Sequence, residues 1–287
     1  MIETFVQSII TGVLMGAIYA LIALGLSIIF GVMNVSNFAH GEIVMISMYL
    51  TYLVGSTLAW DAVVTPLITV PILFAFGFIV YYLLIDRTLR ESYVVALAVT
   101  VGLGIFLRSA ALILGKAQPR ALQYSIIQGS IQLGPYMILT SRLVAAIVSV
   151  LFIAGFAYFL NKTWRGAAIR AASDDLDAAS LMGVNYHRTY ALTFAIGFAL
   201  TAVAGGLLMS FQQTDPSGGS RFGILSYAVI ALAGLGSLPG LLIAGILVAI
   251  AESLAMSFFD PRSRLLAIYS VFILVLWLKP KGLFGRK

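Results

Sequence analysis

The chain has 287 residues, of which 61% are hydrophobic and only 10% carry a charge. Soluble domains carry about 25% charged residues, so 17 basic and 11 acidic side chains are too few to give this body a polar surface. The composition excludes a soluble globular enzyme, a disordered protein and a secreted disulfide scaffold. Because cysteine is absent and only two histidines are present, we expect neither thiol chemistry nor a metal site.

Apolar stretches suited to crossing a membrane follow one another along the chain. A membrane helix needs about 20 residues, and we find nine apolar stretches, at 5–30, 43–58, 66–85, 93–114, 138–160, 190–211, 222–236, 240–259 and 265–278. Those at 43–58, 222–236 and 265–278 are short enough to be half-helices. We therefore predict an all-α polytopic membrane protein, a single domain over residues 1–287, with about 8–10 membrane segments that include broken or re-entrant helices.

Lys and Arg predict the orientation, because connections on the cytoplasmic side are enriched in them. With nine crossings and a cytoplasmic carboxyl terminus, ten basic residues lie inside, namely Arg87, Arg90, Lys162, Arg165, Arg170, Arg188, Lys279, Lys281, Arg286 and Lys287. Six lie outside, namely Lys116, Arg120, Arg142, Arg221, Arg262 and Arg264. The amino terminus is then external, although one additional re-entrant segment would reverse its side.

A polar segment interrupts the apolar pattern at residues 31–42, where Asn34, Ser36, Asn37, His40 and Glu42 occur. Irregular backbone at membrane depth is tolerated only inside protein or beside a water-filled cavity. Asn and Ser also cap helix N-termini, whose positive end favours a carboxylate. A structured, functional element is favoured over an ordinary turn, which would need fewer residues.

A second interruption, Ala-Gly-Leu-Gly-Ser-Leu-Pro-Gly, spans residues 233–240. Proline and glycine change the direction or pitch of a helix. The segment fits equally well a break that lines a translocation pathway and a tight turn between two spans. An echo of the sequence at 19–26 in residues 227–235 could mark an internal repeat, as in transporters with two related halves, or could be chance among Ala, Leu and Ile.

Two charged residues fall inside apolar stretches, where ionisable groups are costly and point to function. Glu252 lies within 240–259, and we interpret it as part of a polar path or as one member of a structural pair. Arg108 lies near the end of 93–114, so its side chain is expected to reach the outer membrane interface.

The connection at about residues 161–189 is predicted to carry a short cytoplasmic helix. Ser173 is a candidate N-cap, and Asp174, Asp175 and Asp177 follow in the first turn. Ala178, Leu181 and Met182 form an apolar face, and Gly183 can end the helix. Such a helix can dock into a groove of a partner protein. Lying on anionic lipid is disfavoured by the acidic residues.

These segments strongly resemble the membrane permeases of branched-chain amino acid ABC importers. The matching pieces lie at 18–25, 38–42, 170–183, 234–240 and 279–285, so the resemblance covers nearly the whole chain. The importer coupling motif Glu-Ala-Ala-x-x-x-Gly is present as Asp-Ala-Ala-Ser-Leu-Met-Gly at 177–183. Aspartate keeps the charge of this motif and shortens its reach. Similar permeases also serve urea and short amides.

The resemblance implies a bacterial inner-membrane importer built from this permease, a second related permease, two cytoplasmic ATPases and a periplasmic solute-binding protein. The chain itself is then not an enzyme. It lacks the GxxxxGK[ST] phosphate loop, holds no cofactor, and leaves ATP and Mg to its ATPase partners. The lipid bilayer surrounds it, and no nucleic acid is expected. The alternative is a secondary transporter or channel driven by an ion gradient, with Glu252 and His40 relaying protons.

The predicted functional residues form two groups. The substrate pathway is assigned to Asn34, Asn37, Phe38, His40, Gly41, Glu42, Gly234, Gly236, Ser237, Pro239, Gly240 and Glu252. Coupling to the ATPase is assigned to Arg170, Asp174, Asp177, Ala178, Ala179, Leu181, Met182 and Gly183.

Overall fold

The computed structural model describes residues 1–89, 91–115, 118–122, 127, 129–234 and 236–285. Every predicted apolar stretch corresponds to a helix, which confirms the all-α polytopic architecture. These helices are α1 (Ile2–Met33), α2 (His40–Leu58), α3 (Pro66–Val80), α5 (Tyr93–Gly115), α6 (Thr140–Lys162), α9 (Tyr186–Met209), α10 (Gly218–Ala233), α11 (Leu238–Phe258) and α12 (Arg264–Leu278). A π-helical turn, η1 (Tyr81–Ile85), continues α3 into α4 (Asp86–Leu89).

Seven of the helical segments in the described part of the chain are long and apolar enough to cross a bilayer. The other two, α10 and α12, have 16 and 15 residues. At 1.5 Å per residue each is about 24 Å long or less, short of the roughly 30 Å hydrocarbon core. The expectation of short segments is therefore confirmed for α10 and α12, whereas α2 reaches spanning length with 19 residues.

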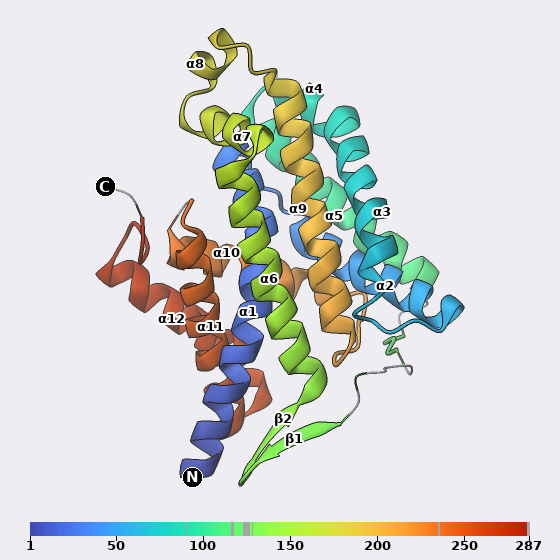
Figure 1. Ribbon diagram of the computed structural model, residues 1–287, viewed down its shortest axis with the longest axis vertical. Helices are drawn as coiled ribbons and strands as arrows, with labels where there is room; N and C mark the ends of the chain where they lie inside the picture. The colour runs from blue at the N-terminus through green and yellow to red at the C-terminus, as the bar shows by residue number, and fades with distance from the viewer. Residues whose placement is uncertain (90, 116–117, 123–126, 128, 235, 286–287) are drawn as a thin grey trace.

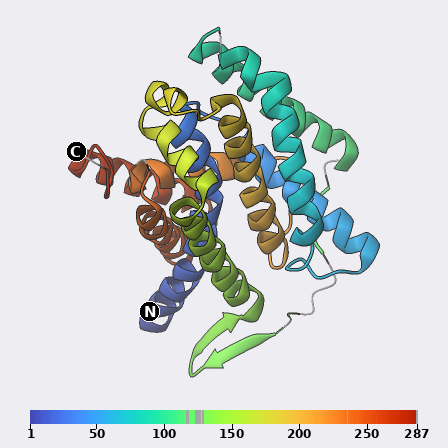
Figure 2. The same ribbon diagram turned by 45° about the horizontal axis from the view of Figure 1, so that its top comes forward.

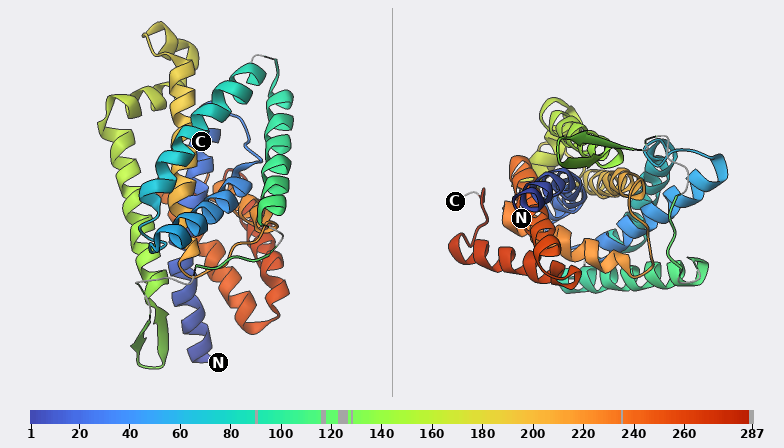
Figure 3. Two further views of the ribbon diagram at one scale, coloured as in Figure 1. Left: turned by 90° about the vertical axis from the view of Figure 1, so that its right-hand side faces the viewer. Right: turned by 90° about the horizontal axis from the view of Figure 1, so that it is seen from below.

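Helices α1 and α9 form the interior of the bundle. In the most apolar stretch of each helix, 78% of the residues of α1 and 83% of those of α9 are buried. The corresponding share is 28% in both α5 and α6, so these two helices present apolar side chains outward. Figure 3 shows α1 and α9 surrounded by the remaining helices when the molecule is seen along its long axis. Their crossing is close, because Gly25 of α1 faces Gly197 of α9 and neither side chain adds bulk.

The two ends of the bundle differ. Figure 1 places the amino terminus at the lower end and α8 at the upper end, with the carboxyl terminus nearer to α8. A short hairpin pairs β1 (Ser130–Leu133) antiparallel with β2 (Tyr136–Leu139), and it extends beyond α6 at the lower end (Figure 2). The sequence did not predict this hairpin. Gln7 fixes it to α1 through two hydrogen bonds to the backbone of Met137, of 2.8 and 3.0 Å.

The helices pack with an approximate internal two-fold relation. Helix α1 packs on α11, α9, α6 and α10, and α9 packs on α3, α1 and α2. The pairs α1–α11 and α1–α10 thus correspond to α9–α3 and α9–α2, and α2 packs on α5 as α10 packs on α12. Because α1 and α9 run in opposite directions (Figure 1), the two halves are inverted. The sequence echo does not follow this relation, since it aligns residues 19–26 of α1 with 227–235, in and after α10. Abundant Ala, Leu and Ile account for that echo.

The upper connection contains α7 (Trp164–Asp174) and α8 (Leu176–Leu181). Thr163 caps α7 by accepting a hydrogen bond from Gly166 N at 3.0 Å, so this helix begins earlier than predicted and runs through Ser173. The prediction of Ser173 as an N-cap is therefore wrong. Asp175 is the N-cap of α8, and its Oδ1 accepts from Ala178 N at 2.9 Å. The basic residues Arg90, Lys116, Arg286 and Lys287 lie outside the described residues.

Candidate functional site

The segment between α1 and α2 is an ordered bend. Helix α1 ends at Asn34, whose φ of 52° reverses the chain and whose N–H donates to the carbonyl oxygen of Phe30. The bend is anchored to α5, because Thr100 Oγ1 donates to the carbonyl oxygen of Ser36 and accepts from the N–H of Phe38, both at 3.2 Å. Several backbone groups freed by the break are thus bonded within the protein, as the membrane environment favours.

Asn37 and His40 hold this bend from inside and do not line a described cavity. Both side chains are fully buried. Asn37 Oδ1 accepts from the N–H of Ala39 at 3.2 Å, and His40 Nε2 contacts the carbonyl oxygen of Ile22 on α1 at 2.9 Å. Their assignment to the substrate pathway stays a prediction, and their contacts are those of a scaffold for Phe38, Gly41 and Glu42.

Helices α2 and α10 come closest at their first turns. A Cβ atom on Gly41 would overlap the carbonyl oxygen of Gly219 and the backbone nitrogen of Gly223. A Cβ on Gly219 would overlap the carboxylate of Glu42. Glycine at these positions therefore permits backbone contact between the two broken segments and leaves room for the Glu42 side chain.

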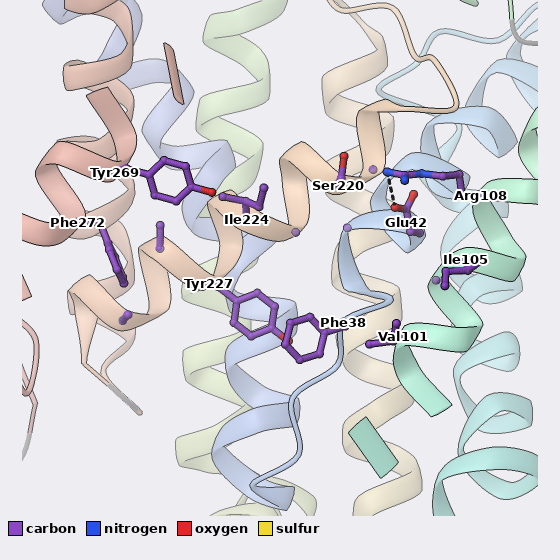
Figure 4. Close-up of a pocket in the computed structure, with 16 residues that line it drawn as sticks. Phe38, Glu42, Val101, Ile105, Arg108, Ser220, Ile224, Tyr227, Tyr269 and Phe272 are labelled. Atoms are coloured by element: carbon purple, nitrogen blue, oxygen red, sulfur yellow. Dashed lines mark ion pairs between the residues drawn. The ribbon is translucent and has the colours of Figure 1, made fainter. Parts of the chain in front are cut away.

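A cavity of about 670 Å³ opens beside this contact. This volume lies within the roughly 300–1,000 Å³ typical of small-molecule sites. Figure 4 shows its lining side chains, which come from the bend, α2, α5, α10 and α12. They are Phe38, Gly41, Glu42, Val101, Gly104, Ile105, Arg108, Gly219, Ser220, Gly223, Ile224, Tyr227, Ala228, Ala231, Tyr269 and Phe272. Ile105 and Tyr269 are exposed in the single chain, so the cavity opens sideways on the face formed by α5, α10 and α12.

One ion pair lies in this largely apolar lining. Arg108 Nη2 of α5 lies 3.3 Å from Glu42 Oε1 of α2, as the dashed line in Figure 4 shows. An opposite charge on the neighbouring helix therefore gives the guanidinium of Arg108 a partner that the sequence did not predict, and its place at the outer membrane interface stays a prediction.

A second cavity of about 560 Å³ adjoins the first and extends toward the carboxyl-terminal tail. The two share Tyr227 and Ala231. Tyr227 stacks on Phe38, with ring centroids 5.2 Å apart and an interplanar angle of 30°. This aromatic pair, drawn in the lower part of Figure 4, therefore lies where the two cavities adjoin.

The described residues of the segment at 234–240, namely Gly234 and residues 236–240, form the end of α10 and the capped start of α11. Gly234 and Gly236 have φ values of 84° and 80°, and Ser237 accepts from Gly240 N at 3.1 Å as the N-cap of α11. Pro239 occupies the first turn of that helix, where its missing N–H is not needed. Of these residues Gly234 lines the second cavity. The turn between two helices that the sequence allowed is confirmed, and the assignment of this segment to a translocation pathway stays a prediction.

The tip of the upper connection is apolar and exposed. Leu181 and Met182 are 88% and 84% exposed, while Ala179 is buried and its carbonyl oxygen accepts from Val184 N at 3.0 Å. Gly183, with a φ of 86°, terminates α8 as predicted. The helix is shorter than expected, spanning only Leu176–Leu181, and Figure 1 shows it projecting from the upper end.

The sequence over residues 8–277 matches the family of branched-chain amino acid transport system permease components. The chain belongs to this family. The permease is 30% identical to the high-affinity branched-chain amino acid transport system permease protein BraD of Pseudomonas aeruginosa, over 98% of this chain and 96% of the relative. It is 32% identical, over the same shares, to the permease protein LivH of Escherichia coli.

An archaeal relative extends this similarity. The probable branched-chain amino acid transport permease protein LivH of Methanocaldococcus jannaschii is 30% identical over 82% of this chain and 76% of its own length. No solved structure matches the permease. The polytopic bundle and the family together establish a multi-pass membrane permease.

Glu252 of the permease lies apart from the main cavity. It forms an ion pair with Arg264 of α12, whose Nη2 also donates to Tyr19 of α1 at 2.9 Å. These residues, with Arg142, line a smaller cavity of about 190 Å³. Of the two roles considered for Glu252, the structural pair describes its contacts, because it joins α1, α11 and α12.

The sequence interpretation missed several residues that line the main cavity. Arg108 was recognised as a charge in a span but not as the partner of Glu42. Tyr227, Tyr269 and Phe272 carry no local signal that separates them from other aromatic residues of membrane helices. Only their position around the α2–α10 contact identifies them.

Proposed function

We propose that this permease is the membrane-spanning subunit of an ATP-driven importer and that it conducts branched-chain amino acids toward the cytoplasm. The observation that carries the proposal is the cavity at the α2–α10 contact, whose apolar lining contains a single ion pair. A branched-chain amino acid has an aliphatic side chain and two opposite charges, and this lining offers partners to both parts. The names of the relatives support the same class of substrate.

The upper end of the bundle is assigned to the cytoplasm, with the carboxyl terminus on the same side. The placement of Arg87, Lys162, Lys279 and Lys281 supports this orientation through the enrichment of basic residues in cytoplasmic connections. The amino terminus and the hairpin then face the periplasm of a bacterial inner membrane, where a solute-binding protein delivers the substrate.

The connection containing α7 and α8 couples the permease to a cytoplasmic ATPase. Leu181 and Met182 supply the apolar anchors, and the exposed carboxylates of Asp174 and Asp177 supply polar contacts at the rim. Arg170 and Ser173 border a cleft at the base of α7. Each of the two ATPase subunits binds ATP and Mg, and this chain holds no cofactor.

Motion at α7 has a direct route to the cavity. Ser173 Oγ donates to the carbonyl oxygen of Gly31 at 2.8 Å, one turn before the bend begins. The bend in turn carries Phe38 and leads into Glu42. A displacement of α7 by the ATPases therefore acts on the residues where the two cavities adjoin.

A second permease completes the pathway. The main cavity opens sideways through the exposed Ile105 and Tyr269, and a charged substrate released on that side would enter lipid at a large free-energy cost. A related permease packed against α5, α10 and α12 closes this side. This arrangement gives one substrate path bounded by two permeases, each with its own ATPase.

Site-directed crosslinking tests the coupling role. The natural chain has no cysteine, so Met182→Cys introduces a single thiol at the tip of the connection. A cysteine-specific crosslinker should join it to the co-expressed ATPase, whereas Ile2→Cys, equally exposed but at the opposite end of the bundle, should give no such product. Equal crosslinking of the two variants, or of neither, would refute the assignment.

Uptake into proteoliposomes separates the importer from its rival. The assembled complex should accumulate leucine only with ATP and a loaded binding protein, and the permease alone should not. Uptake by the permease alone under a proton gradient would instead support a secondary transporter. No contact of His40 or Glu252 favours that rival, because each already binds a neighbouring helix.

A further inference from the structure

The main cavity has opposite charges at one end and none among its other lining side chains. Among the described lining residues only Glu42 and Arg108 are charged. Figure 4 places this pair at one side of the cavity, with Tyr269 and Phe272 at the opposite side and Ile224 between them. A ligand that fills the cavity therefore meets a charged end and an apolar end.

The ion pair leaves part of each charged group without a partner. Glu42 Oε2 and Arg108 Nε are buried and have no hydrogen-bond partner within the described part of the chain. The single contact of 3.3 Å is longer than the roughly 2.7–2.9 Å of a strong charge-assisted bond. The Glu42 side chain is 10% exposed and that of Arg108 is 39% exposed. The partly exposed guanidinium of Arg108 can thus accept a further partner from the cavity, whereas Glu42 Oε2 lies against Gly219 and leaves Oε1 as the oxygen that faces Arg108.

We propose that Glu42 and Arg108 form a binding site for the two charged groups of an α-amino acid. The α-carboxylate binds the guanidinium of Arg108, whose planar fork can engage both carboxylate oxygens. The α-ammonium binds Glu42 Oε1, the oxygen that Arg108 releases when it turns to the α-carboxylate. The aliphatic side chain then extends over Ile224 toward Tyr269 and Phe272. This inference deepens the proposed function and rests on it.

An exchange of partners explains how such a site binds substrate without trapping it. The ligand replaces one contact, between Glu42 and Arg108, by two contacts of the same kind. When the ligand leaves, the two side chains bind each other again, so neither is left as an isolated charge in a low-dielectric site. Binding is therefore weak enough for release, as conduction through a pore requires.

Gly219 is the third part of the site. A Cβ at this position would occupy the space of the Glu42 carboxylate and approach its Cα to 3.0 Å. Glycine therefore allows Glu42 to lie against α10 with one oxygen toward Arg108. Gly102 provides a control position on α5 outside the cavity lining, because a Cβ there meets no atom within 4 Å.

The test uses the full importer in proteoliposomes, with ATP-driven leucine uptake and ATPase stimulation by the loaded binding protein measured in parallel. Glu42→Gln and Arg108→Gln should each reduce uptake roughly tenfold or more, the scale of a lost charge-assisted bond. The double variant separates the two roles of the pair. A purely structural pair predicts recovery, because no charge is left alone, whereas a substrate site predicts uptake as low as in the single variants.

Arg108→Lys provides a second test that does not depend on assembly of the double variant. Lysine keeps the charge and its pairing with Glu42 but loses the fork that engages a carboxylate at two oxygens. Uptake should fall several-fold while the amount of assembled complex is unchanged. Gly102→Ala on α5, where a Cβ meets no atom within 4 Å and which does not line the cavity, is the control and should transport nearly as the wild type.

The outcomes distinguish this site from the proposed function itself. If the wild-type complex accumulates no amino acid, the proposed function fails. If the wild type transports leucine while Arg108→Lys or the double variant transports at the same rate, the proposed function stands and the Glu42–Arg108 site is refuted.

Discussion

The contact between α2 and α10 gives the most direct test of the architecture, through the substitution Gly41→Ala. The added Cβ would lie 2.8 Å from Gly223 Cα and would overlap two further backbone atoms of α10. Carbon atoms pack at about 3.5–4.0 Å, so the two helices must move apart by about 1 Å. Backbone atoms cannot rotate away as a flexible side chain can.

The magnitude follows from the cost of overpacking. An extra methyl group in a well-packed interior costs about 1–3 kcal/mol, and the clash at Gly41 belongs at the upper end because it involves backbone on both sides. At roughly 2 °C per kcal/mol for a chain of this size, the unfolding midpoint should fall by about 6 °C. Uptake should fall as well, because the same contact positions Glu42.

Thermal unfolding of the purified permease in detergent, followed by intrinsic fluorescence, measures this effect. Gly155→Ala on α6 is the control, because a Cβ there meets no atom within 4 Å and alanine is the better helix former. Its midpoint should be unchanged or slightly higher. An equal midpoint for Gly41→Ala and wild type would refute the close contact of the two broken segments.

Three further substitutions test the connection that contains α7 and α8 and the ion pair between Glu252 and Arg264. Asp175→Ala removes the hydrogen bond that caps Ala178 N and should destabilise α8 by about 1 kcal/mol. Co-purification with this variant should recover less ATPase. Asp175→Asn, which keeps the cap, is the control. Gly183→Ala strains a residue at a φ of 86° by about 1–2 kcal/mol, so ATPase stimulation should fall, and wild-type stimulation would contradict the turn. Glu252→Gln leaves Arg264 buried without its carboxylate and should destabilise the permease by about 3–5 kcal/mol; an unchanged unfolding midpoint would exclude a structural pair.

The number and order of the membrane helices follow from the sequence because a helix in contact with lipid needs apolar residues along nearly its whole length. Their ends follow less well, since polar caps lie outside the apolar pattern. Helix α9 begins at Tyr186, before the apolar stretch, because Asn185 accepts from Arg188 N at 3.0 Å. Ser173 and Asp175 are both suitable N-caps by residue type. Because Thr163 already starts α7, Ser173 lies inside that helix and Asp175 is the residue that caps α8.

The candidate site was only partly visible in the sequence. The polar bend was recognised because amide, imidazole and carboxylate groups are costly in hydrocarbon, and Phe38, Gly41 and Glu42 from it line the main cavity. The partner of Glu42 was not recognised, because Arg108 lies on another helix and no short-range pattern records which helices pack together. The hairpin at 130–139 was missed because each strand has only four residues and because β2 runs directly into the apolar stretch predicted at 138–160.

The inverted arrangement of the halves explains why the cavity is polarised. Gly41 and Gly219 are both the second residue of a helix that follows a break, so the two halves meet through equivalent glycines. The next positions differ, with Glu42 on α2 and Ser220 on α10. The half containing α2 and α5 therefore supplies the charges, and the half containing α10 and α12 supplies Tyr269. In the proposed site this asymmetry of side chains sets one orientation for an α-amino acid, with its charged groups toward α5 and its aliphatic part toward α12.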